Sequence, residues 1–192
     1  MQNGNNYITM LGTGNALATR CYNTCFTLHG KEGVLLVDAG GGNGILAQLE
    51  KAGIHREDIS DLFVTYAHTD HLLGCIWMMR MALQFRYPLR VWSHKKVLGL
   101  LTDICRQILP PKEAEGIGSL VTINCLNDGE QFEAGGFAMQ CFDIPARCSM
   151  LLAWQMNLTS RTLSFITQRT IHLTLAANDT QKRQRQLSAV VS

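Results

Sequence analysis

The sequence predicts a layered α/β domain in which helices cover a β-sheet. Short apolar segments rich in β-branched residues alternate, over residues 7–144, with longer segments of helical spacing. Glycine-rich breaks separate these segments and indicate turns between them. Hydrophobic residues make up 46% of the 192 residues, so the chain can bury a core, which excludes a disordered polar chain.

The predicted elements follow one another as strands, helix, strand, helix, strand, helix and strands. We expect strands of one sheet over residues 7–11, 24–28, 34–37, 62–65 and 89–92. We expect strands of a second sheet over residues 120–125, 130–133 and 137–144. Helices are expected over residues 45–52, 71–84 and 93–108. Gly53 is placed to end the first helix, and Asp70 is placed to cap the second.

The composition changes at Pro145. All 17 glycines lie before residue 146, whereas about three would be expected in a segment as long as residues 146–192. Residues 146–192 carry six Lys or Arg against one Asp, and residues 1–145 carry 11 Lys or Arg against 14 acidic residues. We therefore expect a domain over residues 1–145 and an atypical tail over residues 146–192. The tail is either translated out of frame or naturally divergent, and we favour the shifted frame.

Charge and cysteine content exclude several classes of protein. The net charge of +2 is too small to indicate nucleic-acid binding by itself. No run of 18 apolar residues occurs, so we expect no membrane span and no membrane partner. The seven cysteines lack the spacing of a disulfide framework, which indicates reduced thiols and a cytoplasmic location.

Two imidazoles and one carboxylate occupy four positions at a predicted strand-to-helix junction. They belong to His68, Asp70 and His71. Nitrogen and carboxylate oxygen ligands suit zinc, iron or manganese, and such a metal could turn bound water into a hydroxide nucleophile. Asp70 alone would be an ordinary helix cap, and a lone histidine in a turn is more often solvated. The cluster of three favours a metal site.

This segment resembles the His-x-His-x-Asp-His signature of the metallo-β-lactamase fold hydrolases. Three further segments resemble the ribonuclease Z-like branch and occur in the same order: Leu11-Gly12-Thr13-Gly14, Asn23-Thr24-Cys25-Phe26 and Leu36-Val37-Asp38-Ala39-Gly40. The resemblance covers about residues 7–144. It implies the αββα sandwich of that family, with a C-terminal part that is incomplete or divergent in this chain.

The resemblance also implies a function. It points to a metal-dependent hydrolase, ribonuclease Z-like or phosphodiesterase-like, that uses metal-bound hydroxide and one or two divalent metals, zinc first and manganese or iron as alternatives. By this resemblance His68 would bind the first metal, Asp70 and His71 would bind the second, and Asp70 would also orient the attacking water. Asp38 would support the site by hydrogen bonding, although it could equally be a turn residue that holds its own backbone. A small-molecule or RNA phosphodiester is the implied substrate, and a homodimer is the implied assembly.

The sequence departs from this family at its ligand positions. Tyr66 stands where the signature has its first histidine, and a phenol with a pKa near 10 is a poor ligand for zinc at neutral pH. Pro145 stands where the next histidine ligand is expected, and loss of one base from a histidine codon would explain both Pro145 and the altered tail. The family's later Asp and terminal His have no counterpart. We therefore expect weak or absent activity, and the alternative is a non-catalytic, degenerate or truncated member with a reduced metal site.

A nucleotide-binding α/β domain is a further alternative. Gly12 and Gly14 follow a predicted strand, as in a dinucleotide-binding fingerprint. The third glycine position holds Leu17, however, and the phosphate-binding lysine of a P-loop is missing. The sequence therefore argues against this alternative.

Overall fold

Two β-sheets and a layer of helices make up the part of the chain that the computed structural model describes, residues 6–144, 149–158, 161–168 and 170–176. The first sheet contains β1 (Tyr7–Gly12), β2 (Cys25–His29), β3 (Val34–Val37), β4 (Ile59–Phe63), β5 (Leu89–Ser93) and β6 (Val121–Cys125), in that order. The second sheet contains β7 (Gln131–Ala134), β8 (Phe137–Ile144), β9 (Ser149–Leu158), β10 (Arg161–Gln168) and β11 (Thr170–Ala176). The helices are α1 (Gly44–Lys51), η1 (Arg56–Asp58), α2 (Thr69–Phe85), α3 (Lys95–Ile108) and α4 (Pro111–Ala114).

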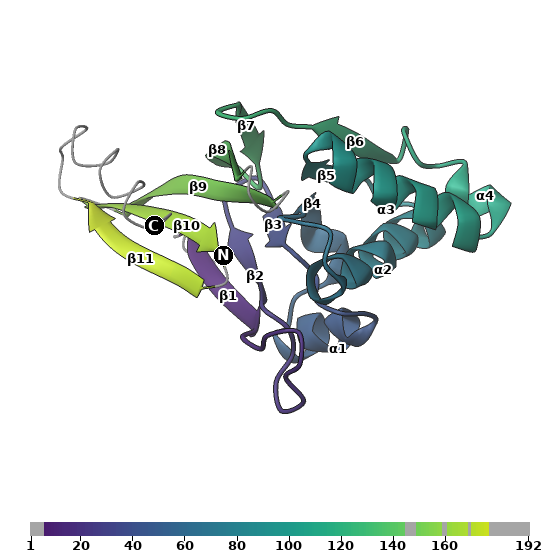
Figure 1. Cartoon of the computed structure of the whole chain (residues 1–192), viewed down its shortest axis with the longest axis horizontal. Coiled ribbons are helices and arrows are strands. Elements are labelled where there is room, and N and C mark those ends of the chain that lie inside the picture. Colours follow the sequence, from purple (N-terminus) through teal and green to yellow (C-terminus); the bar gives the residue numbers. More distant parts are fainter. Residues whose placement is uncertain (1–5, 145–148, 159–160, 169, 177–192) are drawn as a thin grey trace.

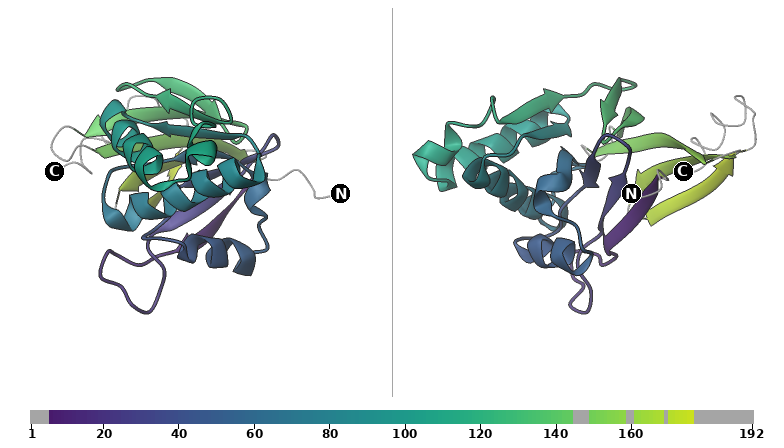
Figure 2. Two further views of the ribbon diagram at one scale, coloured as in Figure 1. Left: turned by 90° about the vertical axis from the view of Figure 1, so that its right-hand side faces the viewer. Right: turned by 180° about the vertical axis from the view of Figure 1, so that it is seen from behind.

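The first sheet lies between the helices and the second sheet (Figure 1). Strands β1, β2 and β3 pair antiparallel, whereas β3, β4, β5 and β6 run parallel. Each parallel step is bridged by a helix, as parallel pairing requires. The two further views in Figure 2 show the same layering. This arrangement confirms the predicted α/β fold with helices on a sheet.

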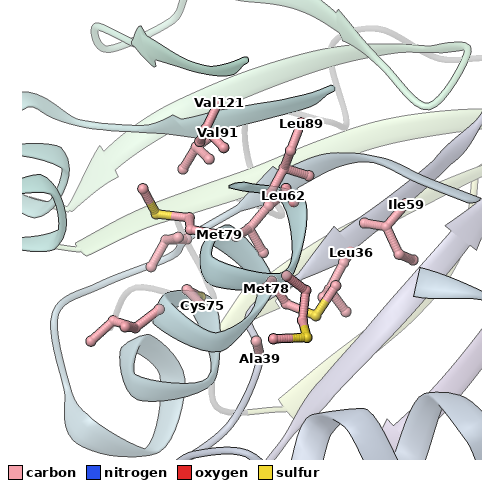
Figure 3. Close-up of a cluster of buried hydrophobic side chains, with 14 of the residues drawn as sticks. Leu36, Ala39, Ile59, Leu62, Cys75, Met78, Met79, Leu89, Val91 and Val121 are labelled. Carbon is pink, nitrogen blue, oxygen red and sulfur yellow. The ribbon is translucent and has the colours of Figure 1, made fainter. Parts of the chain in front are cut away.

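The core has two parts. One lies between the helices and the first sheet, where α2 contributes Cys75, Met78 and Met79 against Leu36 and Leu62 of the sheet (Figure 3). The other lies between the two sheets. It is built mainly from side chains on the face of β2 and β3 that points away from the helices, and from side chains of β7 and β8. The first sheet is thus covered on both faces, which explains why its strands read as nearly continuous apolar runs.

Strand β6 corrects one prediction. Residues 120–125 were expected in the second sheet, but β6 extends the first sheet, with Val121 paired to Leu89 and Ile123 paired to Val91. The crossover through α3 and α4 returns the chain to the edge of the parallel sheet, beside β5. The other two predicted strands, β7 and β8, do lie in the second sheet.

The start of α2 corrects another prediction. His68, and not Asp70, is the N-cap residue, and α2 begins at Thr69. Asp70 lies in the first turn, where a carboxylate interacts favourably with the positive end of the helix dipole. The preceding strand β4 also ends at Phe63 instead of residue 65. Residues 64–68 therefore form a connection long enough to carry side chains of its own into the site.

The backbone of residues 149–158, 161–168 and 170–176 continues the second sheet. β9 pairs antiparallel with β8, and β10 and β11 follow beside it. Pro145 lies outside the described residues, and the boundary at residue 145 stays a prediction. None of the helices in the described part of the chain combines the length and the hydropathy needed for a bilayer span.

Stability should fall as His29 becomes protonated. His29 is buried at the end of β2, with Nε2 2.8 Å from Thr27 Oγ1 and its ring stacked on Tyr7. Burial lowers the pKa of His29, although the charge of Asp58 opposes this. The unfolded chain therefore binds more protons just below the ordinary pKa of about 6.5, and this contribution to stability is lost as the pH falls through that range.

We expect urea unfolding to show this loss between about pH 7.5 and pH 5.5. The His29→Gln protein, whose glutamine can still accept a hydrogen bond from the Thr27 hydroxyl, should lose less stability over the same pH range. Equal losses in the two proteins would contradict the assignment to His29.

Candidate active site

Asp38 joins the ends of two neighbouring parallel strands. It follows β3 directly and has a φ of +55°, a left-handed conformation that aspartate tolerates better than most residues. Its N–H donates to the carbonyl oxygen of Phe63, and its Oδ1 accepts the N–H of Thr65 at 2.8 Å. Thr65 Oγ1 donates to Asp38 Oδ2 at 2.7 Å. The carboxylate is thereby fixed at the carboxyl ends of β3 and β4, the edge where open α/β sheets place their sites.

His71 is held from three sides. Its Nδ1 lies 2.6 Å from Asp38 Oδ2, its Nε2 lies 2.6 Å from the hydroxyl of Tyr66, and Asp70 Oδ2 lies 3.4 Å from the same Nε2. Burial alone would lower the pKa of His71, but the hydrogen bond and charge of Asp38, together with the charge of Asp70, raise it overall. His71 is thus a buried imidazole with both ring nitrogens in polar contact.

His68 is placed differently from the other predicted site residues. It is exposed at the N-cap of α2, and its ring meets the ring of Tyr66 edge-on, with centroids 4.6 Å apart. The Tyr66 ring also lies 4.1 Å from the ring of His71. The structure therefore brings together Asp38, Asp70 and His71, and the tyrosine ring contacts both imidazoles.

The described residues do not form a complete site for a divalent metal. Within the described ranges, no three His, Cys, Asp or Glu side chains are grouped so that they could hold a metal ion. Zinc sites use at least three well-oriented protein ligands. His71 Nε2, the nitrogen opposite the Asp38 contact, is already engaged by a phenol. The metal roles expected for His68, Asp70 and His71 stay predictions.

Cysteines near the site supply no thiolate. Cys25 and Cys75 are both buried and not paired in disulfides. Burial, followed by the charge of Asp38, raises the pKa of both thiols. They remain protonated at neutral pH and act as small apolar groups against the site.

The loop after Asp38 is held by residues that the sequence did not single out for this role. Tyr22 donates its hydroxyl to the carbonyl oxygens of Ala39 and Gly42, both at 2.9 Å. Asn23 Oδ1 accepts the N–H of Gly41. Asn23 belongs to one of the segments that carry the family resemblance, so its position was marked, whereas nothing in the sequence marked Tyr22.

The first glycine loop does not form a nucleotide cradle. A side chain at Gly12 would collide with the carbonyl oxygens of Tyr22 and Asn23, and Gly14 exchanges backbone hydrogen bonds with Tyr22 and Thr24. The chain continues from this loop into β2 and not into a helix. The glycines therefore allow close backbone packing.

Comparison with known families decides the classification. The profile of the family described as anti-Pycsar protein Apyc1 matches residues 6–192, nearly the whole chain. The chain belongs to the anti-Pycsar protein Apyc1 family. In this Apyc1-family chain, a segment of 68 residues is also 38% identical to ribonuclease Z of Methanosarcina acetivorans, over 35% of the chain and 22% of the relative. This partial match supports the ribonuclease Z-like branch.

Solved structures establish the fold of this Apyc1-family chain. The metallo-β-lactamase SMB-1 bound to mercaptoacetic acid superposes with a TM-score of 0.61 at 17% identity, over 97% of this chain and 72% of the other. A β-lactamase from Chitinophaga pinensis gives 0.57 at 20% identity, over 77% and 56%. Native FEZ-1 from Legionella gormanii gives 0.58 at 15% identity, over 86% and 63%. The fold is the metallo-β-lactamase fold, as the sequence predicted.

The chain spans only part of several relatives. It covers about a fifth of the matched ribonuclease Z and a little over half of the Chitinophaga enzyme. The comparisons establish the Apyc1 family and the metallo-β-lactamase fold of this chain. The activity, substrate and partners of this chain are matters of proposal.

Proposed function

We propose that this chain has the scaffold of a metal-dependent phosphodiester hydrolase of the ribonuclease Z-like kind, with weak turnover because its metal site is reduced. The observation that carries the proposal is the placement of Asp38, Asp70 and His71 together at the ends of β3 and β4. The partial identity to a ribonuclease supports a phosphodiester, in RNA or a small molecule, as the substrate class. Zinc dependence, a cytoplasmic location and a homodimer remain predictions.

The site residues take separate parts in this proposal. Asp70 is the catalytic residue, because its half-buried carboxylate lies at the site and can orient an attacking water as a general base. Asp38 is a positioning residue that acts through His71, and Thr65 in turn holds the Asp38 carboxylate. His68 is exposed at the same junction, where it can contact substrate.

Hydrolysis of bis-p-nitrophenyl phosphate tests the proposal. We expect a slow release of nitrophenolate by the wild-type chain and a loss of at least about 100-fold in Asp70→Asn, the lower end of what one general base contributes. We expect a smaller loss in His68→Ala. His55→Ala removes another exposed histidine, outside the site, and should leave the rate unchanged. A rate that Asp70→Asn and His68→Ala do not reduce, or no rate above buffer, would contradict the proposal.

A non-catalytic protein is the second candidate. The contact that favours it is the Tyr66 hydroxyl on His71 Nε2, which leaves this imidazole without a free nitrogen. This candidate predicts no hydrolysis by the wild-type chain or by any of the three variants. The same assay therefore separates the two candidates.

A further inference from the structure

We propose that Tyr66 occupies the position of a metal ion at this site, because its hydroxyl lies against the Nε2 atom of His71 and so weakens metal binding. The inference goes beyond the proposed hydrolysis, since it concerns metal binding alone. It starts from the hydrogen-bonded series that runs from Tyr66 through His71 to Asp38 and on to Thr65. Each link in this series is 2.6 to 2.7 Å long.

The direction of the hydrogen bonds follows from the chemistry of Asp38. A carboxylate can only accept, and Asp38 already accepts the N–H and the hydroxyl of Thr65. His71 therefore donates Nδ1–H to Asp38, and in the neutral ring the lone pair lies on Nε2. The Tyr66 hydroxyl lies 2.6 Å from that nitrogen, close enough to donate a hydrogen bond to the lone pair of the neutral ring. Nε2 is the atom that a metal would require, because metal-binding histidines commonly give their other nitrogen to a carboxylate.

Packing makes the hydrogen bond between Tyr66 and His71 hard to break. His71 is 7% exposed, so solvent has little access to its ring. The Tyr66 ring contacts the ring of His71 and also that of His68. A metal bound to His71 Nε2 would have to break the Tyr66 hydrogen bond.

Removal of the phenol should therefore open the site. Tyr66→Phe keeps an aromatic ring but leaves Nε2 without its donor, and a buried acceptor without a partner is unfavourable. Zinc can then bind to Nε2 without breaking an internal hydrogen bond. Tyr66→His removes the phenol and adds an imidazole, which supplies a further ligand of the type that zinc prefers.

Zinc affinity, measured by competition with a chromophoric chelator, tests the inference. We expect Tyr66→Phe to bind zinc about tenfold more tightly than the wild-type chain, the order expected when one hydrogen bond no longer has to be broken, and Tyr66→His more tightly still. Tyr7→Phe is the matched control, because its phenol lies on β1 against His29, and its affinity should equal that of the wild type.

A second readout covers the case in which a variant is less stable. Zinc should raise the melting temperature of Tyr66→Phe and Tyr66→His by more than that of the wild type, since binding to the folded state stabilises it by mass action. Equal zinc affinities and equal melting shifts in the wild type and both Tyr66 variants would overturn the inference. Neither measurement uses a phosphodiester, so a failure of the proposed hydrolysis would leave this result standing.

Discussion

Gly74→Ala should destabilise this protein more than most single substitutions in its core. A Cβ atom at Gly74 would lie 1.7 Å from the carbonyl oxygen of Ala39 and 2.4 Å from its carbonyl carbon. The N–H of Gly74 also donates to the carbonyl oxygen of Gly40, so α2 and the loop after β3 touch through backbone atoms. Neither segment can move apart without loss of that contact, and we expect a loss of about 3 kcal/mol in the free energy of unfolding.

Gly99→Ala is the matched control in another helix. Gly99 is exposed in α3, and a Cβ atom there would meet nothing within 4 Å. Helix propensity predicts a gain of about 1 kcal/mol for this change. Urea unfolding of the two variants measures both values. A Gly74→Ala protein as stable as the wild type would show that α2 does not lie against Ala39 as closely as described.

Asp61→Ala should be similarly harmful, for an electrostatic reason. Asp61 is fully buried in β4, and its carboxylate accepts from Arg90 Nε at 2.7 Å, from Trp92 Nε1 at 2.8 Å and from the N–H of Gly135 at 2.9 Å. Ser60 Oγ donates to it as well. Removal of one partner from such a network leaves buried donors unsatisfied, and we expect a loss of about 4 kcal/mol.

Glu57→Ala tests whether that effect depends on burial. Glu57 pairs with Arg56 at 3.1 Å, but both side chains are more than a third exposed. Exposed pairs contribute little, so the expected change is below about 0.5 kcal/mol. Thermal unfolding of Asp61→Ala and Glu57→Ala compares the stability lost on removal of a buried acidic residue with that lost on removal of an exposed one. Similar small losses in the two would contradict the structural role of Asp61.

Chain order accounts for the proximity of Asp38 and His71. Asp38 ends one parallel strand, and His71 follows the next, so strand-end geometry brings them together across 33 residues. The Tyr66 contact could not be predicted in this way. The sequence marks Tyr66 as a poor ligand, but its contact with two imidazoles depends on side-chain rotamers and on a connection that starts before the predicted strand end.

The fold was also predicted only in part. Helix spacing located α1, α2 and α3 to within two residues at each end, because their apolar positions recur with the helical period. The sheet that β6 joins was predicted wrongly, since an edge strand has no local signal for its partner. The network around Asp61 was not predicted either, because it joins β4 to Gly135, 74 residues away.

The zinc content of the purified wild-type chain would most directly show whether Tyr66 closes the site. The chain is equilibrated with zinc, passed through a desalting column and analysed by inductively coupled plasma mass spectrometry. The hydrogen bond from Tyr66 to His71, and the lack of three grouped ligands among the described residues, predict far less than one zinc ion per chain. One or two zinc ions retained per chain would contradict a site closed by Tyr66.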